Sequence, residues 1–186
     1  MTETVDAVVN DIRSRLNASV TATSLAMVGL RLVHDRFAGS SAILSEDNPD
    51  PRVFIGAGDP SDPSTKAHAG GIQLSKILEL TERDGDASVV LGQQWLVAFY
   101  QDWEDDLRPR LASALGIPTN RIDEPVFGDL RLMRHDIIHK GGIATPRNTG
   151  RCRVLHWFSA GERIRVRDEH FRELQEAVGN SGMLML

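Results

Sequence analysis

The sequence has a single cysteine, Cys152, among its 186 residues. One cysteine excludes an intramolecular disulfide and a metal cluster built on several cysteines, and it favours a reducing, cytoplasmic setting. The sequence also lacks an apolar run of the roughly 18 residues that cross a membrane, so no membrane partner is expected. No signal peptide is expected either, because the first residues, MTETVDAVVNDIR, are acidic and polar-periodic.

Positive charge is scarce outside one segment of the chain. The whole sequence has 21 lysines and arginines against 26 aspartates and glutamates, a net charge of −5. Residues 131–172 contain ten of the basic residues and four of the acidic ones, which leaves this segment at +6 and the remainder at −11. A basic segment in an acidic protein favours local anion binding over broad affinity for nucleic acid. The alternative interpretation is an ordinary solvated surface.

Apolar residues recur at three- and four-residue steps in several stretches, which predicts a mainly α-helical single domain over residues 1–186. Helices are expected at residues 3–37, 71–83, 87–115, 124–140 and 168–178. Pro109 is expected to kink the third of these helices. The first helix has a single apolar stripe, which other helices or a second subunit must cover.

Turn-forming residues concentrate in one internal stretch. Residues 39–70 are rich in proline and glycine and are expected to form a loop or insertion, with residues 52–55 as a short strand. A β-hairpin is expected at residues 151–167, followed by the final helix. Apolar residues alternate there with Arg163, Arg165 and Arg167, which would give the hairpin one strongly basic face.

The sequence LRLMRHDIIHKGG, at residues 130–142, is the most informative stretch. Its helix is expected to begin near Pro125, because proline fits a first turn, and to end at Gly141 and Gly142. A turn of 100° per residue places Arg131, His135 and His139 on the outer face. The same rotation forms a buried stripe from Val126, Leu130, Met133 and Ile137.

Arg134 falls beside the buried stripe, where a half-buried guanidinium needs a partner. The expected partner is the acidic cluster of the preceding helix, formed by Asp102, Glu104, Asp105 and Asp106. These carboxylates have two other interpretations, pairing with Arg108 or Arg110 and binding of a divalent cation. Arg134 and His139 lie about 140° apart on an ideal helix. The long reach of arginine narrows this gap, and a loosened last turn or a two-fold axis between two copies would narrow it further.

An arginine, a polar neighbour and a histidine five positions after the arginine, near a helix end, resemble the motif of the HEPN superfamily. Arg134 and His139 match the motif, and His135 matches its polar neighbour. The flanking Leu-Arg and Gly-Gly resemble HEPN sequences of bacterial toxin and defence systems. A looser likeness in helical layout covers residues 1–142. The insertion at 39–70 and the C-terminal hairpin depart from a minimal HEPN bundle.

The resemblance implies a HEPN-like helical bundle that acts as a homodimer and cleaves RNA without a metal or other cofactor. By this likeness His139 moves the proton of the ribose 2′-hydroxyl, Arg134 holds the scissile phosphate in a cleft that both copies share, and His135 assists. The side chains suit these roles, because imidazole titrates near neutral pH and guanidinium binds phosphate bidentately. The cations expected to bind the substrate are Arg131, Lys140, Arg163 and Arg165.

Two other functions fit the same sequence. The first is a non-catalytic HEPN-like module that binds RNA, a nucleotide or a protein. The second is a dimeric interaction protein of the immunity or antitoxin type, suggested by the long first helix and the apolar C-terminal residues SGMLML. For the ribonuclease, an antitoxin or regulatory protein is a further candidate partner.

Overall fold

The computed structural model of the protein describes residues 3–39, 48–54 and 71–180. The chain divides into two compact units, Met1–Leu25 with Val89–Leu186 and Ala26–Ser88. Two helices, α1 (Val5–Ala38) and α3 (Asp86–Asp102), have residues in both units. The motif helix and all the residues predicted to act with it belong to the first unit.

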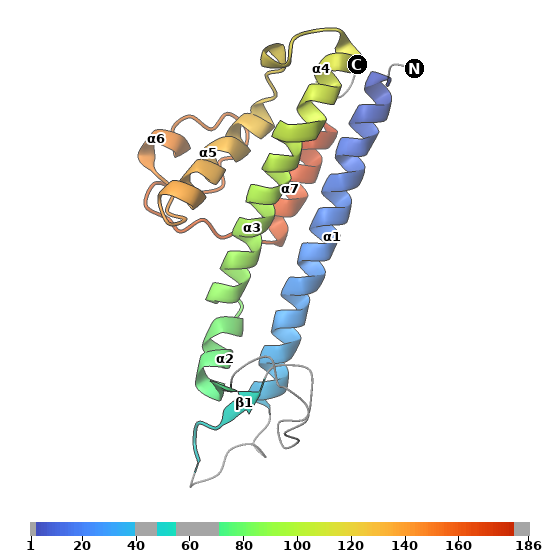
Figure 1. The fold of residues 1–186 in the computed structure, drawn as a ribbon. Helices are drawn as coiled ribbons and strands as arrows, with labels where there is room; N and C mark the ends of the chain where they lie inside the picture. Colours follow the sequence, from blue (N-terminus) through green and yellow to red (C-terminus); the bar gives the residue numbers. More distant parts are fainter. Residues whose placement is uncertain (1–2, 40–47, 55–70, 181–186) are drawn as a thin grey trace. The chain divides into compact units, whose positions relative to one another are not determined.

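The protein is mainly α-helical, as the sequence predicts (Figure 1). The remaining helices are α2 (Leu74–Thr81), α4 (Arg108–Leu115), α5 (Pro125–His139), α6 (Pro146–Thr149) and α7 (Asp168–Gly179). A π-helical turn, η2 (Trp103–Leu107), joins α3 to α4, and a 3-10 turn, η3 (Thr119–Arg121), precedes α5. Strands β1 (Arg52–Phe54) and β2 (Gly71–Gln73) pair antiparallel. A mainly α fold with a small antiparallel sheet is therefore confirmed.

The sheet does not lie where the C-terminal hairpin was predicted. Residues 151–167 form no hairpin, and β1 instead falls within the short strand expected at 52–55. The second half of residues 151–167 pairs instead with the residues that follow the motif helix, through a bridge between Ile143 and Arg163. The amide of Ala144 donates to the carbonyl of Glu162 at 2.8 Å, which extends this pairing.

The first half of residues 151–167 is bound to α5 instead of to a second strand. The carboxylate of Asp129 is buried and accepts the backbone amides of Arg153, Val154 and Leu155 at 2.7 to 2.9 Å. These amides are donors that a hairpin partner would have used. A buried carboxylate on the neighbouring helix therefore replaces the second strand, since a buried carboxylate needs donors as much as the amides need an acceptor.

The core of the first unit is built from the apolar faces of its long helices. Trp103 of η2 stacks on Phe127 of α5, with ring centroids 3.7 Å apart. Trp95 of α3 meets Phe171 of α7 edge to face at 4.6 Å. The first half of α1 adds the buried residues Val8, Val9, Ile12, Leu16 and Val20. Aromatic contacts of this kind contribute about 0.5–1.5 kcal/mol each beyond the area they bury.

The helix is distorted not at Pro109, where a kink was predicted, but in the π-helical turn η2 that precedes it. In η2 the amide of Arg108 donates to the carbonyl of Trp103, five residues back instead of four. Proline lacks an amide donor, and its ring clashes with the carbonyl four residues earlier, here that of Asp105. The π turn widens the helix at this carbonyl, so the chain continues into α4 with Pro109 in its first turn.

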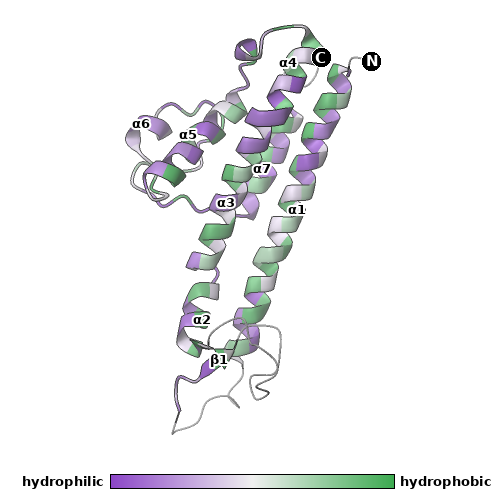
Figure 2. Cartoon of the chain, viewed as in Figure 1, coloured by the Kyte–Doolittle hydropathy of each residue, from purple (hydrophilic) through white to green (hydrophobic). Residues whose placement is uncertain are grey.

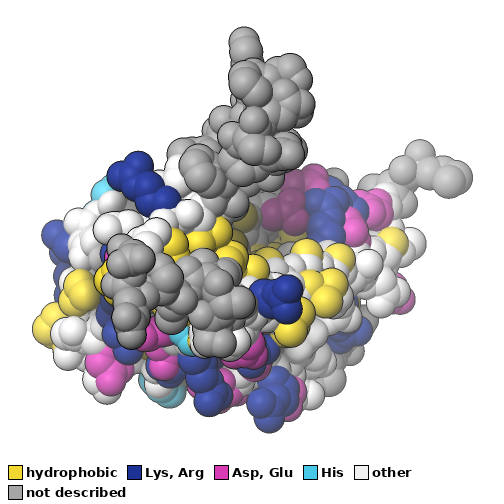
Figure 3. Space-filling model, turned by 90° about the horizontal axis from the view of Figure 1, so that it is seen from below, with side chains coloured by type: hydrophobic (Ala, Val, Ile, Leu, Met, Phe, Trp, Pro, Cys, Tyr) yellow, Lys and Arg dark blue, Asp and Glu magenta, His cyan; other side chains and the backbone are white. Residues whose placement is uncertain are grey.

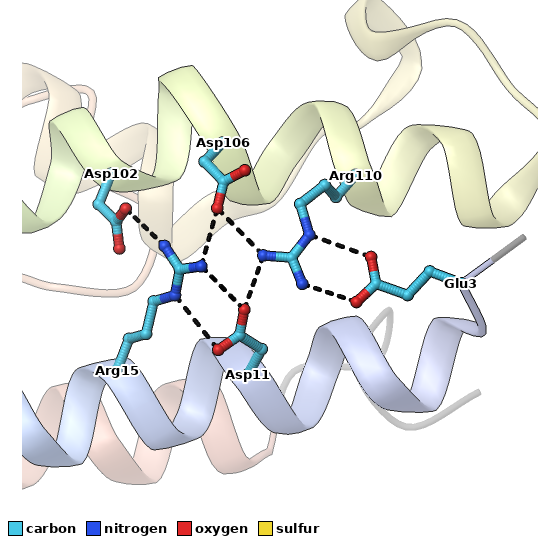
Figure 4. Close-up of polar contacts among 6 residues, drawn as sticks. All are labelled: Glu3, Asp11, Arg15, Asp102, Asp106 and Arg110. Atoms are coloured by element: carbon cyan, nitrogen blue, oxygen red, sulfur yellow. Dashed lines mark hydrogen bonds and ion pairs between the residues drawn. The ribbon is translucent and has the colours of Figure 1, made fainter.

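A network of ion pairs, called the α1 clasp here, fixes the start of α1 to the α3–α4 segment (Figure 4). Arg110 lies 2.6 Å from Glu3 and from Asp11 and 3.0 Å from Asp106. Arg15 lies 2.8 Å from Asp102 and also contacts Asp11 and Asp106. The side chains of the clasp are Glu3, Asp11, Arg15, Asp102, Asp106 and Arg110. Two of the carboxylates predicted to pair with Arg134 are thus paired with other arginines.

The second unit contains the end of α1, the two strands and α2. The register of the sheet pairs Val53 with Ile72. Asp50 accepts both the amide and the hydroxyl of Ser75 at 2.8 Å, at the start of α2. His34 on α1 contacts the carbonyl of Leu78 on α2 at 3.2 Å. These contacts join the elements of this unit.

By length and composition, α1 is apolar enough to cross a membrane. An 18-residue window of this helix reaches a mean hydropathy of 1.3, and only 11% of the window is buried. Figure 2 shows few strongly hydrophilic residues in the middle of α1, and apolar side chains are visible at the surface in Figure 3. Leu25 and Leu32 are 67% and 64% exposed. Core helices and signal sequences meet the same criterion, so the feature alone assigns no membrane role.

Candidate functional site

Helix α5 presents Arg131, His135 and His139 on its exposed face. Successive members are four residues apart, so they lie one above another on the helix. The opposite face is buried through the core residues Leu130 and Met133. The predicted division of the motif helix into an apolar stripe and an outer polar face is therefore observed.

The end of α5 is regular. The helix is α-helical to His139, and the amides of Lys140 and Gly142 both donate to the carbonyl of Asp136 at 2.9 and 3.1 Å. Gly141 and Gly142 then take φ values of 62° and 75°, the left-handed region that favours glycine. The predicted loosening of the last turn is wrong, because paired glycines end the helix without unwinding it.

Arg134 points to α3 and not to His139. Its guanidinium donates to the side-chain oxygen of Gln101 at 3.2 Å and lies 5.7 Å from the centre of the Tyr100 ring. Its Nε is buried without a hydrogen-bond partner. In the part of the chain that the structure describes, no carboxylate lies within ion-pair distance of Arg134. The predicted acidic partner is wrong, since an amide and an aromatic face take its place.

The structure brings together the two histidines of the motif. The rings of His135 and His139 have centroids 4.8 Å apart and are inclined by 52°. Both side chains are exposed. Two imidazoles at this distance can act on one substrate, and imidazole is a side chain that serves both as a general acid and as a general base.

His135 also lines an open cavity of about 710 Å³, called the basic cavity here. Its walls come from α5 and from the segment that follows this helix. The lining residues are Arg131, Leu132, His135, Lys140, Thr145, Arg147, Asn148 and Arg151. Three of the predicted site residues, Arg131, His135 and Lys140, therefore share one cavity. Sequence reasoning missed Arg147 and Arg151, although both lie in the basic segment 131–172.

Within the described residues, the four cations of the basic cavity take part in no ion pair. Among residues 3–39, 48–54 and 71–180, no carboxylate lies within ion-pair distance of Arg131, Lys140, Arg147 or Arg151. Several arginines elsewhere in this unit are paired with carboxylates. Arg108 contacts Glu104 at 2.9 Å and Arg153 contacts Asp123 at 2.8 Å, in addition to the α1 clasp. Four cations without an ion pair to the described residues therefore share one cavity, where their charge favours an anionic ligand.

Asp136 holds the two walls of the basic cavity together. Its buried carboxylate accepts the amide of Thr145 at 2.8 Å, the hydroxyl of Thr145 at 3.0 Å and the side-chain amide of Asn148 at 2.6 Å. Asn148 Nδ2 also lies 3.3 Å from Nδ1 of His135. The contacts fix α6 and Arg147 against α5, beside the imidazole of His135.

Arg163 and Arg165 lie outside the lining of the basic cavity. Both side chains are half-buried. Arg163 is in the backbone bridge with Ile143, and Nε of Arg165 is buried without a hydrogen-bond partner. Because the predicted hairpin is absent, the basic face expected from these arginines is not formed.

Burial removes two other reactive groups from consideration. Burial, with Asp129 and Asp136 nearby, raises the pKa of the Cys152 thiol to about 11, so it is a thiol and not a nucleophilic thiolate at neutral pH. Burial, and donation to Glu104, raise the pKa of Tyr100 to about 12. Within the described ranges no group of three or more histidine, cysteine, aspartate or glutamate side chains is placed to hold a metal ion.

Comparison with known proteins gives no relative: no family model, no curated protein and no solved structure matches the chain.

Proposed function

We propose that the protein is an endoribonuclease that cleaves RNA at the basic cavity. One observation carries this proposal: His135 lies 4.8 Å from a second imidazole, in the wall of a cavity whose four cations form no ion pair with the described residues. Cations hold the phosphate, and two imidazoles supply the proton transfers. RNA carries its own nucleophile, the ribose 2′-hydroxyl, so no nucleophilic side chain is required.

In the proposed reaction, neutral His135 takes the proton of the 2′-hydroxyl. The 2′-oxygen then attacks the phosphorus, and the bond between phosphorus and the 5′-oxygen breaks. Protonated His139 gives its proton to the leaving 5′-oxygen, which leaves a 2′,3′-cyclic phosphate and a 5′-hydroxyl. Arg131, next to His135 on the same face, stabilises the charge on the phosphoryl oxygens.

This assignment changes the role of Arg134 from the one that the HEPN resemblance implies. Its contacts with Gln101 and Tyr100 direct it to α3. In the proposal Arg134 holds α5 in place, and the cations of the basic cavity bind the phosphate. His139 retains a proton-transfer role, and His135 becomes its partner in the chemistry.

A homodimer remains part of the proposal. Ile138 and Ile143, on either side of His139 in the sequence, are 46% and 41% exposed, and exposed apolar residues of this kind favour association. A toxin or anti-phage defence role and control by an antitoxin are proposed from the HEPN resemblance alone, and cytoplasmic action is proposed from the single cysteine. Sedimentation at micromolar concentration tests the homodimer, and a monomer would contradict it.

The test of the proposed function is RNA cleavage in EDTA, with the products analysed for 2′,3′-cyclic phosphate ends. His135→Ala and His139→Ala are each expected to lower the cleavage rate about 10²- to 10⁴-fold, the usual contribution of a general acid or base. His156→Ala, which removes an exposed histidine outside this cavity, is the matched control and should cleave at the wild-type rate. Cleavage that persists unchanged in both motif variants would exclude the proposal.

A non-catalytic RNA- or nucleotide-binding module is the second candidate. The observation that favours it is the separation of Arg134 from His139, because the arginine–histidine pair of the motif is not assembled within one chain. RNA binding by the wild-type protein with no cleavage of any RNA supplied would favour this function over the first.

A further inference from the structure

We infer that the basic cavity binds the sugar–phosphate backbone of one RNA strand and does not read its bases. This inference rests on the proposed function and specifies its substrate class. Arg131 and Lys140 are nine residues apart, which corresponds to about 13 Å along a helix. Arg147 and Arg151 stand on the opposite wall. Charges spread over this length suit successive phosphates better than a single one.

The two uncharged polar side chains of the lining, Thr145 and Asn148, are already engaged within the protein. The amide of Asn148 donates to Asp136 at 2.6 Å, and the hydroxyl of Thr145 contacts the same carboxylate. No phenylalanine, tyrosine or tryptophan is among the lining residues of the basic cavity. Bases of single strands are contacted by stacking on such rings, on histidine or on guanidinium planes, and by hydrogen bonds to their edges. Of these means the lining keeps only His135 and the arginines, to which the proposed function gives proton transfer and phosphate binding. The cations therefore dominate recognition.

The size of the basic cavity selects a strand over a duplex. A volume of about 710 Å³ lies within the range of pockets that enclose a small ligand. A double-stranded RNA-binding domain, by comparison, spans about 16 base pairs and contacts two successive minor grooves. A short length of single strand fits the cavity, whereas a duplex meets only its rim.

The experiment measures binding to 2′-O-methyl oligonucleotides, which lack the nucleophile and cannot be cleaved. Fluorescence anisotropy is recorded with the full chain and three 12-nucleotide strands, one of U, one of A and one of C, at 50 to 200 mM salt. Affinities for the three strands are expected to agree within about threefold, and four phosphate contacts predict a fall of about 50-fold over this salt range. Arg147→Ala and Arg151→Ala should each lower the slope of log Kd against log salt by about 0.7.

The matched controls are Arg153→Ala and Arg108→Ala, whose arginines are paired with Asp123 and Glu104 and should leave the slope unchanged. A preference above tenfold for one base, tighter binding of a duplex, or equal competition by polyglutamate would overturn the inference. Absence of RNA binding would do so too. Because these strands cannot be cleaved, a protein that binds them as expected but cleaves no RNA contradicts the ribonuclease proposal alone.

Discussion

Asp136 accepts both the backbone amide and the hydroxyl of Thr145, nine residues later in the chain, at 2.8 and 3.0 Å. The contact closes the chain on itself directly after the Gly-Gly end of α5. It places Arg147 against the helix that carries His135. The residue after His135 in the sequence therefore shapes the basic cavity, although its own side chain is buried beneath it.

Asp136→Asn is expected to destabilise the protein by about 1–3 kcal/mol, because one carboxylate oxygen becomes an amide that faces the donors of Thr145 and Asn148. The free energy of unfolding is measured by urea denaturation. Asp35→Asn is the control, since Asp35 is exposed. An equal effect of the two substitutions would contradict the role given to the buried carboxylate.

Gly142→Ala is expected to destabilise the protein more than Gly141→Ala. Both glycines have positive φ, which is strained for alanine by about 1–2 kcal/mol. A Cβ at Gly142 would also meet the side-chain amide of Gln93, whereas one at Gly141 would meet nothing. The difference between the two melting temperatures isolates the contact with Gln93. Equal melting temperatures would show that Gln93 moves aside freely.

Stability is expected to fall as the pH decreases below about 6.5, the ordinary pKa of histidine, because His170 is buried. Burial lowers its pKa in the folded protein, although Glu169 and Glu173 oppose the shift. Its Nδ1 accepts the amide of Arg167 at 3.0 Å, which requires the neutral ring. The unfolded chain therefore binds a proton that the folded chain rejects, and stability is lost from pH 6.5 down to the lowered pKa.

The measurement is urea denaturation from pH 7.5 to 5. The dependence should weaken in His170→Gln and persist in His156→Gln, which changes an exposed histidine. An identical dependence in both variants would contradict the assignment to His170.

The α1 clasp is expected to add stability above pH 4 that disappears in stronger acid. Arg110, followed by Arg15, lowers the pKa of Asp11 below its usual 3.8. A carboxyl with a lowered folded pKa stabilises the protein above its unfolded pKa, and this contribution is lost as the pH falls through the folded value. Arg110→Met should lower stability at pH 7 by about 1 kcal/mol.

The Arg110→Met variant should also show a smaller loss between pH 4 and pH 2 than the wild type. Since exposed ion pairs are screened by salt, the difference should shrink in 1 M NaCl. Lys76→Met, which removes an exposed pair with Glu79 within one helix turn, is the control. A difference that grows with salt would argue against an electrostatic clasp.

Helical periodicity was sufficient to predict most of the helices. The helix predicted at 168–178 is observed as Asp168–Gly179, and that at 3–37 as Val5–Ala38. Local signals are strong there, because a buried stripe repeats over several turns and glycine or proline marks the ends. The outer placement of His135 and His139 follows from the same rotation.

The contacts that depend on distant residues could not be predicted. The alternation at residues 162–166 predicts a strand, but it does not show that the partner is 142–144 and not 151–158. The choice between these two partners depends on Asp129 of α5, whose carboxylate accepts hydrogen bonds from the amides of residues 153–155. The burial of His170 could not be predicted for the same reason. Charged residues flank it in the sequence, which favours a surface position, but its contacts with Trp157 and Phe158 bury it.

The cations of the site show the same limit. Charge counting placed a basic segment at residues 131–172, yet it could not separate paired arginines from unpaired ones. Arg153 and Arg151 are two residues apart, and only Arg153 meets a carboxylate in the part of the chain that the structure describes. The choice of partners depends on how α5 packs, which no local pattern specifies.

Arg131 and Arg134 provide the sharpest test, since they are one turn apart on the same helix. Arg131 lines the basic cavity, and Arg134 contacts Gln101 and Tyr100. Arg131→Ala should weaken binding of an uncleavable RNA strand about fivefold to tenfold, the order expected for one charge-assisted phosphate contact of about 1–1.4 kcal/mol. Its melting temperature should change little, because the side chain is exposed. Arg134→Ala should instead lower the melting temperature and affect binding less. The opposite ranking would return the phosphate-binding role to Arg134, as the HEPN resemblance implies.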